Sequence, residues 1–248
     1  LPEVDVDAIR GSGVTVALDS VRGAGGPVMA ELFRRLGVQM SGINLEADGR
    51  FPREPEPIPA NLGELSDLVR HGGSAVGMAV DPDVDRLALV DETGAPIGED
   101  YTLALAVRAV LGSRPAGAPP ATVVVNLSTS LVVEDAARAH GARFLRAPVG
   151  EANVARAIVT EGAVIGGEGN GGVILPSLHV GRDAPLAAAL ILHYLAQARA
   201  PLSELVASAP RYSIVKAKVP RGADLAATYG ALRNAFPDAG VDERYGLR

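Results

Sequence analysis

The feature that most restricts the fold of this chain is an acidic segment between two apolar runs. The segment contains three aspartates at alternating positions and then an arginine, in the order Asp81, Pro82, Asp83, Val84, Asp85 and Arg86. Residues 75–80 before it and 87–90 after it are apolar, with one glycine among them. Short apolar runs that end at turn-forming residues are typical of buried strands. The pattern therefore predicts two buried strands joined by a loop that carries three carboxylates.

Three carboxylates on one tight loop repel one another, so we expect this loop to bind a cation. A hard divalent ion takes oxygen ligands, and Mg²⁺ usually keeps coordination positions for water or a substrate phosphate. We therefore predict a Mg²⁺ site at Asp81, Asp83 and Asp85. The simpler alternative, a solvated acidic turn between two strands, stays open at this point.

Two other uses of the acidic loop follow from its spacing. An EF-hand loop has acids at its first, third, fifth and twelfth positions, which Asp81, Asp83, Asp85 and Glu92 would fill. Its sixth position requires glycine and its flanks should be helices, whereas this chain has Arg86 there, so an EF-hand is excluded. The other use is an aspartyl-phosphate enzyme of the HAD-like kind, in which Asp81 or Asp83 would itself be the nucleophile. This alternative stays open.

Composition limits the classes of partner. The chain has 248 residues, of which 48% are hydrophobic, enough for two domains with sizeable cores. The net charge of −6, the lack of tryptophan and the lack of a long basic run argue against a nucleic-acid partner. There is no cysteine, which excludes disulfides. The longest apolar stretch, residues 186–192, is too short to cross a bilayer. We therefore expect a soluble cytoplasmic protein without a membrane partner.

Strand and helix patterns alternate along both halves of the chain. The sequence predicts strands at 14–18, 75–80, 87–90, 122–126, 142–145, 164–165 and 173–175, and helices at 28–36, 62–70, 100–111, 131–140, 152–160 and 184–198. Asn61 is expected to cap one helix and Ser128–Ser130 another. The proline-rich residues 48–59 predict a stiff irregular loop. Residues 112–120 have the composition of a domain linker, so we expect two successive α/β domains of one architecture.

A second candidate site is a glycine-rich segment in the second half. Five glycines within residues 166–172 surround Glu168 and Asn170. Glycines let backbone approach a ligand closely, and a carboxylate can bind two neighbouring sugar hydroxyls. A tight turn with a surface acid is the alternative. His179, Arg182 and Asp183 could line the same opening, although His179 is predicted to be a partly buried structural histidine.

Four segments in order resemble those of one family, the α-D-phosphohexomutases, which include phosphoglucomutase, phosphomannomutase and phosphoglucosamine mutase. The acidic loop matches the family's metal loop, usually Asp-Gly-Asp-x-Asp-Arg, and residues 167–171 match its sugar loop, usually Gly-Glu-x-Ser-Gly. Residues 48–57 match a loop before the last strands of the metal domain, and residues 149–151 match a third-domain loop near the substrate. The resemblance covers the family's second and third domains and the start of the fourth.

The resemblance implies an α/β fold with two successive three-layer α/β/α domains and mixed sheets. The expected boundaries are 1–112 for the metal domain, 113–210 for the sugar domain, and 211–248 for a linker strand and the truncated start of a further domain. It also implies roles for eight residues: Mg²⁺ binding by Asp81, Asp83 and Asp85, contact with the transferring phosphate by Arg86, and substrate binding by Glu168, Asn170, Gly167 and Gly150. The complete enzyme would interconvert hexose 1-phosphate and 6-phosphate through a phosphoserine and a bisphosphate intermediate.

The chain also departs from the family pattern. Pro82 replaces a glycine, Asn170 replaces a serine, Gly172 stands where histidine is common, and Ala152 stands where many members have lysine or arginine. The Thr-Ala-Ser-His-Asn-Pro-like motif of the phosphorylated serine and the Arg-Pro-Ser-Gly-Thr-Glu-like phosphate loop do not occur in these 248 residues. We therefore expect a piece of a longer enzyme that is inactive by itself. The remaining alternatives are the HAD-like enzyme and a sugar-phosphate-binding module without catalysis.

Overall fold

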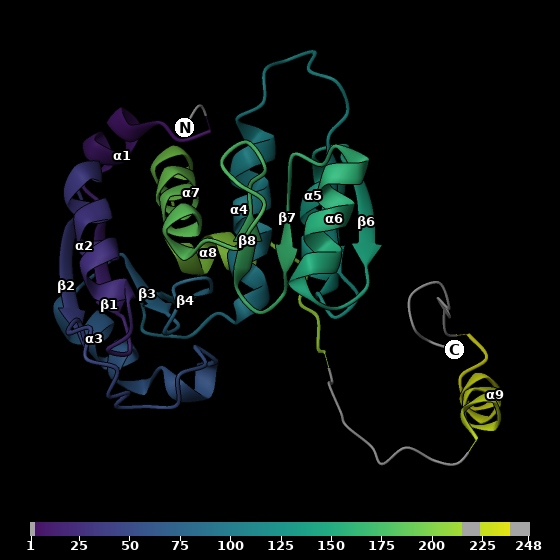
Figure 1. The fold of residues 1–248 in the computed structure, drawn as a ribbon. Helices are drawn as coiled ribbons and strands as arrows, with labels where there is room; N and C mark the ends of the chain where they lie inside the picture. The colour runs from purple at the N-terminus through teal and green to yellow at the C-terminus, as the bar shows by residue number, and fades with distance from the viewer. Residues whose placement is uncertain (1–2, 215–223, 239–248) are drawn as a thin grey trace. The chain divides into compact units, whose positions relative to one another are not determined.

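The computed structural model describes residues 3–214 and 224–238. The chain divides into two compact units, Leu1–Tyr212 and Ser213–Arg248 (Figure 1). In the second unit the described part is a helix, α9 (Leu225–Ala235), whose N-cap Asp224 accepts a hydrogen bond from the backbone N–H of Ala227. Most of the linker strand expected at the start of residues 211–248 lies outside the described residues. All the elements described below belong to the first unit.

The first sheet of this unit has four strands in the order β2-β1-β3-β4. They are β1 (Thr15–Asp19), β2 (Gln39–Ile43), β3 (Val76–Val80) and β4 (Leu87–Asp91). β1 is parallel to β2 and β3, whereas β4 runs antiparallel to β3, with Val80 opposite Leu87. The acidic loop therefore closes the antiparallel pair at the carboxyl end of β3, as the flanking apolar runs predict.

The second sheet repeats this topology in the order β6-β5-β7-β8. Its strands are β5 (Thr122–Asn126), β6 (Arg143–Ala147), β7 (Ile165–Glu168) and β8 (Gly172–Ile174). β5 is parallel to β6 and β7, and β8 is antiparallel to β7. The glycine-rich loop between β7 and β8 thus has the same place in the second sheet as the acidic loop has in the first. Two mixed sheets of one architecture confirm the expected fold class.

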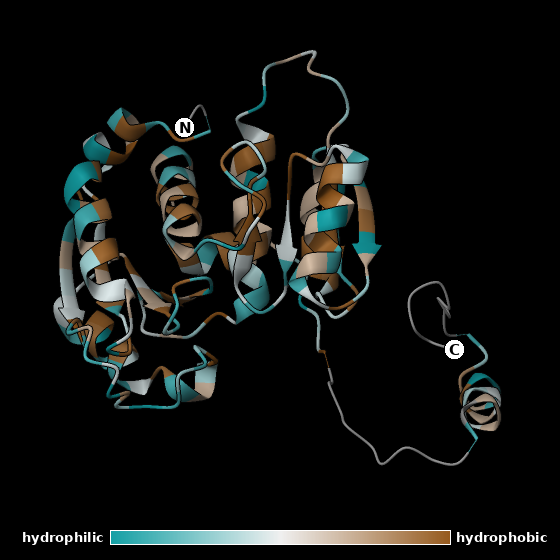
Figure 2. Ribbon diagram, viewed as in Figure 1, coloured by the Kyte–Doolittle hydropathy of each residue, from teal (hydrophilic) through white to brown (hydrophobic). Residues whose placement is uncertain are grey.

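Helices cover both faces of both sheets. They are α1 (Val6–Ser12), α2 (Gly25–Leu36), α3 (Gly63–Gly72), α4 (Glu99–Gly112), α5 (Leu131–Ala139), α6 (Glu151–Glu161), α7 (Ala184–Ala198) and α8 (Leu202–Ala207), with a 3₁₀ turn at Pro59–Asn61. α3 buries one face of the first sheet, and α6 buries one face of the second. In Figure 2, α2 carries both hydrophilic and hydrophobic residues, as expected for a helix with one buried side.

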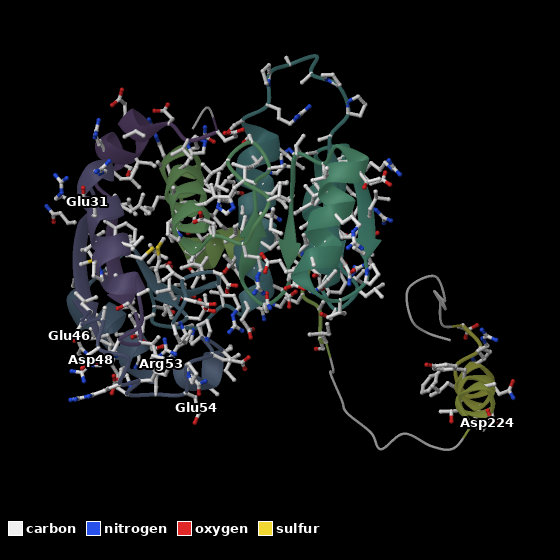
Figure 3. All side chains as sticks on the ribbon, viewed as in Figure 1. Glu31, Glu46, Asp48, Arg53, Glu54 and Asp224 are labelled. Carbon is white, nitrogen blue, oxygen red and sulfur yellow. The ribbon has the colours of Figure 1, made fainter. Side chains whose placement is uncertain are left out.

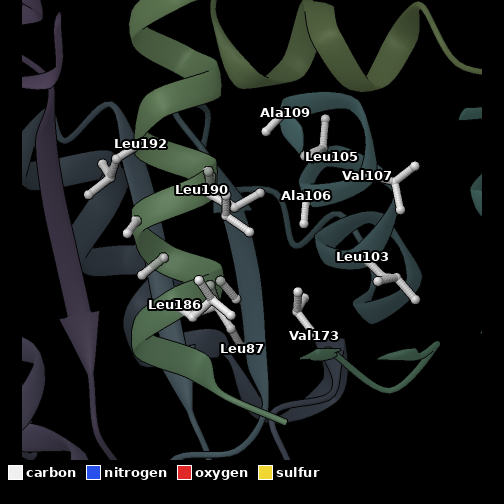
Figure 4. Close-up of a cluster of buried hydrophobic side chains, with 14 of the residues drawn as sticks. Leu87, Leu103, Leu105, Ala106, Val107, Ala109, Val173, Leu186, Leu190 and Leu192 are labelled. Atoms are coloured by element: carbon white, nitrogen blue, oxygen red, sulfur yellow. The ribbon is translucent and has the colours of Figure 1, made fainter. Parts of the chain in front are cut away.

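α4 and α7 join the two sheets into one core. A single cluster of buried side chains includes residues of both helices, of β1 and β3 in the first sheet, and of β5 and β7 in the second. Figure 4 shows Leu186 and Leu190 of α7 beside Leu87 of the first sheet and Val173 of the second. Burial of a leucine contributes about 1.5–3 kcal/mol. This shared core fixes the sheet ends on which the candidate site is built.

The structure differs from the sequence expectations in a few elements. Asn61 does not cap α3: Leu62 holds the N-cap position, and the Asn61 amide donates to the backbone oxygen of Glu56 at 2.8 Å. α1, β2 and α8 were not expected; β2 is a largely exposed edge strand without the alternation that marks a half-buried one. Among the helices of the described residues, none is long and apolar enough to span a membrane.

Candidate functional site

The acidic loop brings its three carboxylates together at the end of β3. Ligand oxygens of Asp81, Asp83 and Asp85 all lie within 4.8 Å of one another. Asp81 is fully buried, Asp83 is exposed and Asp85 is intermediate. The turn requires a left-handed backbone at Val84, with φ of +64°, which is unusual for a β-branched residue. The backbone thus holds a strained conformation that gathers like charges.

Asp81 is held as an anion by its own loop. Its Oδ1 accepts hydrogen bonds from the backbone N–H groups of Asp85 and Arg86, both at 3.1 Å. Its Oδ2 accepts one from Nε of Arg86 at 2.6 Å. Burial by itself would raise the pKa of Asp81, but hydrogen bonds from Arg86 outweigh burial and lower the pKa below the usual value. Arg86 also forms an ion pair with Glu56 at 3.4 Å, which fixes its guanidinium at the loop.

Asp85 is the loop carboxylate that forms ion pairs with two arginines, Arg86 at 3.7 Å and Arg182. Burial, followed by the hydrogen bond and charge of neighbouring Asp81, raises the pKa of Asp85 to about 6. Its Oδ1 is buried and has no hydrogen-bond partner among the described residues. A buried carboxylate oxygen without a donor, next to two further carboxylates, is the arrangement that a hard cation would complete. The residues present therefore fit a divalent metal ion.

Glu168, at the end of β7, is the buried acid of the second loop. Its Oε1 accepts from Nδ2 of Asn126 at 2.8 Å and from the backbone N–H of Gly150 at 3.3 Å. Its Oε2 accepts from Nη1 of Arg182 at 2.8 Å. Gly167 has φ of +153°, and a Cβ there would lie 2.1 Å from the backbone oxygen of Gly172. The predicted sugar-loop residues therefore surround one oriented carboxylate.

Asn170 lies beside this carboxylate loop with its side chain directed to the local backbone. Its Oδ1 accepts from the backbone N–H of Gly172 at 3.4 Å. The preceding Gly169 donates its N–H to Oγ1 of Thr129 at 3.0 Å. The alternative expectation of an exposed surface acid in this turn is wrong, because Glu168 is 4% exposed.

The two loops meet within the first unit. The backbone N–H of Leu87, at the start of β4, donates to the backbone oxygen of Gly171 at 3.0 Å. Arg182 lies between the loops: one terminal nitrogen donates to Glu168, and the other bonds to Oδ2 of Asp85. The structure therefore joins the candidate metal site and the candidate sugar site into one site at the carboxyl ends of the strands, where α/β sheets usually bind ligands.

The proline-rich loop is fixed against the same end of the first sheet. Nε of Arg53 donates to Oδ2 of Asp19 at 2.7 Å, and Asp19 is the buried last residue of β1. Figure 3 shows Arg53 among Glu46, Asp48 and Glu54, which belong to the same loop region. Sequence reasoning missed Asp19 and Arg53 as partners; an aspartate that ends an apolar strand was the available signal.

Two further expectations have clear outcomes. His179 is not partly buried: its side chain is 46% exposed and its Nε2 bonds to Asp183 at 2.9 Å. Ser130 does cap α5, since its Oγ accepts from the backbone N–H of Val132. A cavity of about 700 Å³ between α1, α7 and α8 contains no residue of either loop, so it lies apart from this site.

Family models match most of the chain. A model described as phosphoglucomutase/phosphomannomutase, α/β/α domain II, matches residues 1–94, and the model for domain III matches residues 98–212. The chain belongs to the α-D-phosphohexomutase family. The boundaries that we expected at residues 112 and 210 stay predictions.

Individual family members agree with this assignment. A protein of Methanopyrus kandleri named as a probable phosphoglucosamine mutase is 39% identical over 220 residues, which are 88% of this chain and 47% of that protein. A phosphoglucomutase/phosphomannomutase of Thermococcus kodakarensis is 38% identical over 216 residues, which are 87% of this chain and 46% of that protein. The chain therefore spans about half the length of the curated relatives it matches.

The fold is also similar to a solved family member. The crystal structure of a phosphoglucomutase/phosphomannomutase family protein from Burkholderia thailandensis superposes with a TM-score of 0.72 at 27% identity. The similarity covers 83% of this chain and 46% of that chain.

One departure from the phosphohexomutase pattern, Gly172, has a structural reason, whereas the contacts of Pro82 involve its backbone atoms, which any residue would supply. A Cβ at Gly172 would lie 2.2 Å from Cδ of Arg182, so a side chain there would displace the arginine that joins the loops. Pro82 packs against the turn before α2: its backbone oxygen accepts from the N–H of Ala24 at 2.8 Å. A Cβ at Gly23 would lie 2.5 Å from Cα of Pro82. Nothing in the structure explains Ala152.

Proposed function

We propose that this chain supplies the metal-binding and sugar-binding parts of a phosphohexomutase that interconverts hexose 1-phosphate and hexose 6-phosphate. The substrate class is glucosamine, mannose or glucose phosphate. The observation that carries the proposal is the meeting of the two loops: Leu87 bonds to Gly171, and Arg182 bonds to both Asp85 and Glu168. Family membership supports the same activity, since the matched relatives are named as mutases.

The acidic loop would hold Mg²⁺ through Asp81, Asp83 and Asp85. When bound, the ion would offset negative charge on the transferring phosphoryl group. Arg86 would add a second positive charge at the phosphate, and its guanidinium is already oriented by Asp81 and Glu56. Charge neutralisation of this kind is the main requirement of phosphoryl transfer.

The sugar loop would bind the ring. The Glu168 carboxylate, oriented by Asn126 and by the N–H of Gly150, would accept hydrogen bonds from neighbouring hydroxyls, with Asn170 beside it. Gly167 lets the strand that ends in Glu168 lie close to the backbone of Gly172. These contacts bind the hydroxyls of the sugar ring and do not depend on which phosphate faces the metal. The same contacts can therefore bind a bisphosphate in either orientation. The phosphoserine would come from sequence outside these 248 residues, and the chain by itself would bind without turnover.

The first test measures metal binding by the 248-residue chain. Titration with Mn²⁺, followed by the EPR signal of the free ion, should show one site. Asp83→Asn removes one charged ligand and should weaken binding at least about tenfold. Asp67→Asn is the matched control, because Asp67 is an exposed aspartate of α3 paired with Arg70. Equal Mn²⁺ affinity of the wild type and Asp83→Asn would exclude Asp83 as a ligand, and no Mn²⁺ binding by either would support a sugar-phosphate module without a metal site.

The second test distinguishes the aspartyl-phosphate alternative. Phosphorus NMR of the chain with Mg²⁺, a hexose 1-phosphate and the matching 1,6-bisphosphate should show no 6-phosphate. Both oxygens of Asp81 accept hydrogen bonds from the loop and Arg86, which disfavours this residue as a nucleophile. Turnover that Asp81→Asn abolishes would contradict the serine mechanism and favour the alternative.

A further inference from the structure

Arg182 is shared by carboxylates from three separate segments: the acidic loop, the end of β7 and the start of α6. Its terminal nitrogens bond to Glu168 at 2.8 Å and to Asp85, and its Nε lies 3.4 Å from Oε2 of Glu151. The arginine side chain is only 16% exposed. Glu151 and Glu168 belong to the sugar-binding half, whereas Asp85 belongs to the metal loop. One guanidinium therefore compensates charge on both halves of the site.

The surrounding backbone is built to hold Arg182 in this position. The N–H of Arg182 itself donates to Oε1 of Glu151 at 2.9 Å. The next two residues are fixed as well: Asp183 donates to the backbone oxygen of Val173 at 3.0 Å, and Ala184 donates to that of Val84 at 3.1 Å. Glycine at position 172 leaves the space that the arginine stem crosses. An exposed, loosely held ion pair would lack these features.

The position of Arg182 places it in competition with a cation at the acidic loop. Oδ2 of Asp85 bonds to Arg182, while Oδ1 of Asp85 has no hydrogen-bond partner among the described residues. A divalent ion bound by the three aspartates would take charge from Asp85 and would repel the nearby guanidinium. Nε of Arg182 is buried, lies 3.4 Å from Oε2 of Glu151 and has no hydrogen-bond partner in the described part of the chain, so the guanidinium is not fully satisfied in this position.

We propose that Arg182 is a positioning residue that binds Asp85 when no metal is present and turns to the phosphate of the sugar substrate when metal is bound. The metal releases the guanidinium from Asp85, and the phosphate of the sugar binds the released guanidinium. Metal and hexose phosphate therefore strengthen each other's binding. Coupling of this kind is reciprocal, so the metal strengthens phosphate binding by the factor by which phosphate strengthens metal binding. The inference rests on the proposed function, since it requires both ligands.

The test compares the Mn²⁺ affinities of the wild type and Arg182→Gln without sugar. The pH is about 8, where protons compete only weakly with the metal for carboxylates. Arg182→Gln removes the competing cation and should bind Mn²⁺ at least fivefold more tightly than the wild type. A merely structural role predicts the opposite sign, because loss of a structural arginine would disorder the ligands. Arg143→Gln is the matched control: it removes one arginine of the second sheet, whose partner is Glu161.

A second variant keeps the charge and moves it. Gly172→Ala places a Cβ 2.2 Å from Cδ of Arg182 and should displace the guanidinium from Asp85. Gly172→Ala should bind Mn²⁺ more tightly than the wild type, by a smaller factor than Arg182→Gln. It replaces Arg182→Gln as the test if that variant fails to fold. In the wild type, Mn²⁺ should also strengthen binding of glucose 1-phosphate by roughly tenfold, and this factor should fall at least threefold in Arg182→Gln.

The outcomes separate the two proposals. If the wild type binds Mn²⁺ but neither variant binds it more tightly, the role of Arg182 is overturned and the proposed function stands. If the wild type binds no Mn²⁺, the proposed function fails and the role of Arg182 fails with it. Tighter binding by both variants, with unchanged binding by Arg143→Gln, supports the competition.

Discussion

The acidic loop and the glycine-rich loop have the same place in two sheets of one topology, yet they are stabilised in opposite ways. The acidic loop gathers three carboxylates, and a buried oxygen of Asp85 has no hydrogen-bond partner among the described residues. The glycine-rich loop carries one carboxylate, Glu168, and both of its oxygens accept hydrogen bonds. The first loop leaves a carboxylate oxygen unsatisfied, whereas the carboxylate of the second loop has its hydrogen bonds supplied by the protein. In the proposed function, the same hairpin position therefore serves metal binding in one sheet and a preformed sugar contact in the other.

The central strands of the two sheets show the same contrast. β1 ends in Asp19, which accepts a hydrogen bond from the cation of Arg53. β5 ends in Asn126, which donates one to the anion of Glu168. Both end residues are buried, so each must match the charge of its partner. An acid stands opposite a cation, and an amide stands opposite an acid.

The largest effect that we predict tests the backbone of the glycine-rich loop. Gly171 has φ of +94°, and a Cβ there would lie 2.5 Å from the backbone oxygen of Leu87. Gly171→Ala should therefore lower the free energy of unfolding by about 3 kcal/mol or more, since strain and overpacking each cost about 1–3 kcal/mol. Urea unfolding measures this change.

A second glycine with positive φ provides the control. Gly162, the C-cap of α6, has φ of +59°, and no described atom lies within 4 Å of a Cβ built there. Gly162→Ala should lower the free energy of unfolding by only about 1 kcal/mol, from backbone strain. Equal losses in the two variants would mean that contact between the loops adds no constraint at Gly171.

The next prediction places a second carboxylate beside Glu168. Asn126→Asp keeps the acceptor that Ser128 and Thr129 use, but replaces the donor to Glu168 with an anion. At pH 7 this should lower the free energy of unfolding by about 2 kcal/mol, because the new buried carboxylate would repel Glu168, whose own charge already uses the guanidinium of Arg182.

The pH dependence of this variant has a defined sign. The carboxyl pair would retain a proton in the folded state that the unfolded chain releases, so its pKa would lie above the unfolded values. The loss relative to the wild type should therefore shrink as the pH falls from 7 to about 5, which unfolding at several pH values measures. A loss that is independent of pH would show that shape, and not charge, explains the amide at this position.

Much of the fold could be predicted from the sequence because the strands that carry it are fully buried. The apolar runs of β1, β3, β4 and β5 have a clear pattern. β2 could not be found because it is an exposed edge strand, and exposed strands need no apolar period. Asn61 was misassigned because a capping residue type also suits other local hydrogen bonds.

The candidate site was predictable only where its residues are neighbours in sequence. The three aspartates of the acidic loop and the residues around Glu168 are such local groups. Contacts between distant segments, such as Arg53 with Asp19 and Arg182 with Asp85, depend on how the loops fold over the sheet ends. Arg182 was noted near the opening, but its link to the acidic loop required the three-dimensional structure.

The smallest effect that we predict concerns the proline that replaces a glycine in the acidic loop. Pro82→Gly increases the conformational entropy of the unfolded chain and should lower the free energy of unfolding by about 0.4–1 kcal/mol. Pro120→Gly, at an exposed loop position, controls for this entropy and should lose a similar amount. Mn²⁺ affinity should stay within about twofold of the wild type, because all three aspartates remain and their folded geometry is held by the bonds of Asp81. A decrease of more than about fivefold would instead show that the rigid ring of Pro82 holds the carboxylates together before the metal arrives, and the acidic loop would then be as preorganised as the glycine-rich one.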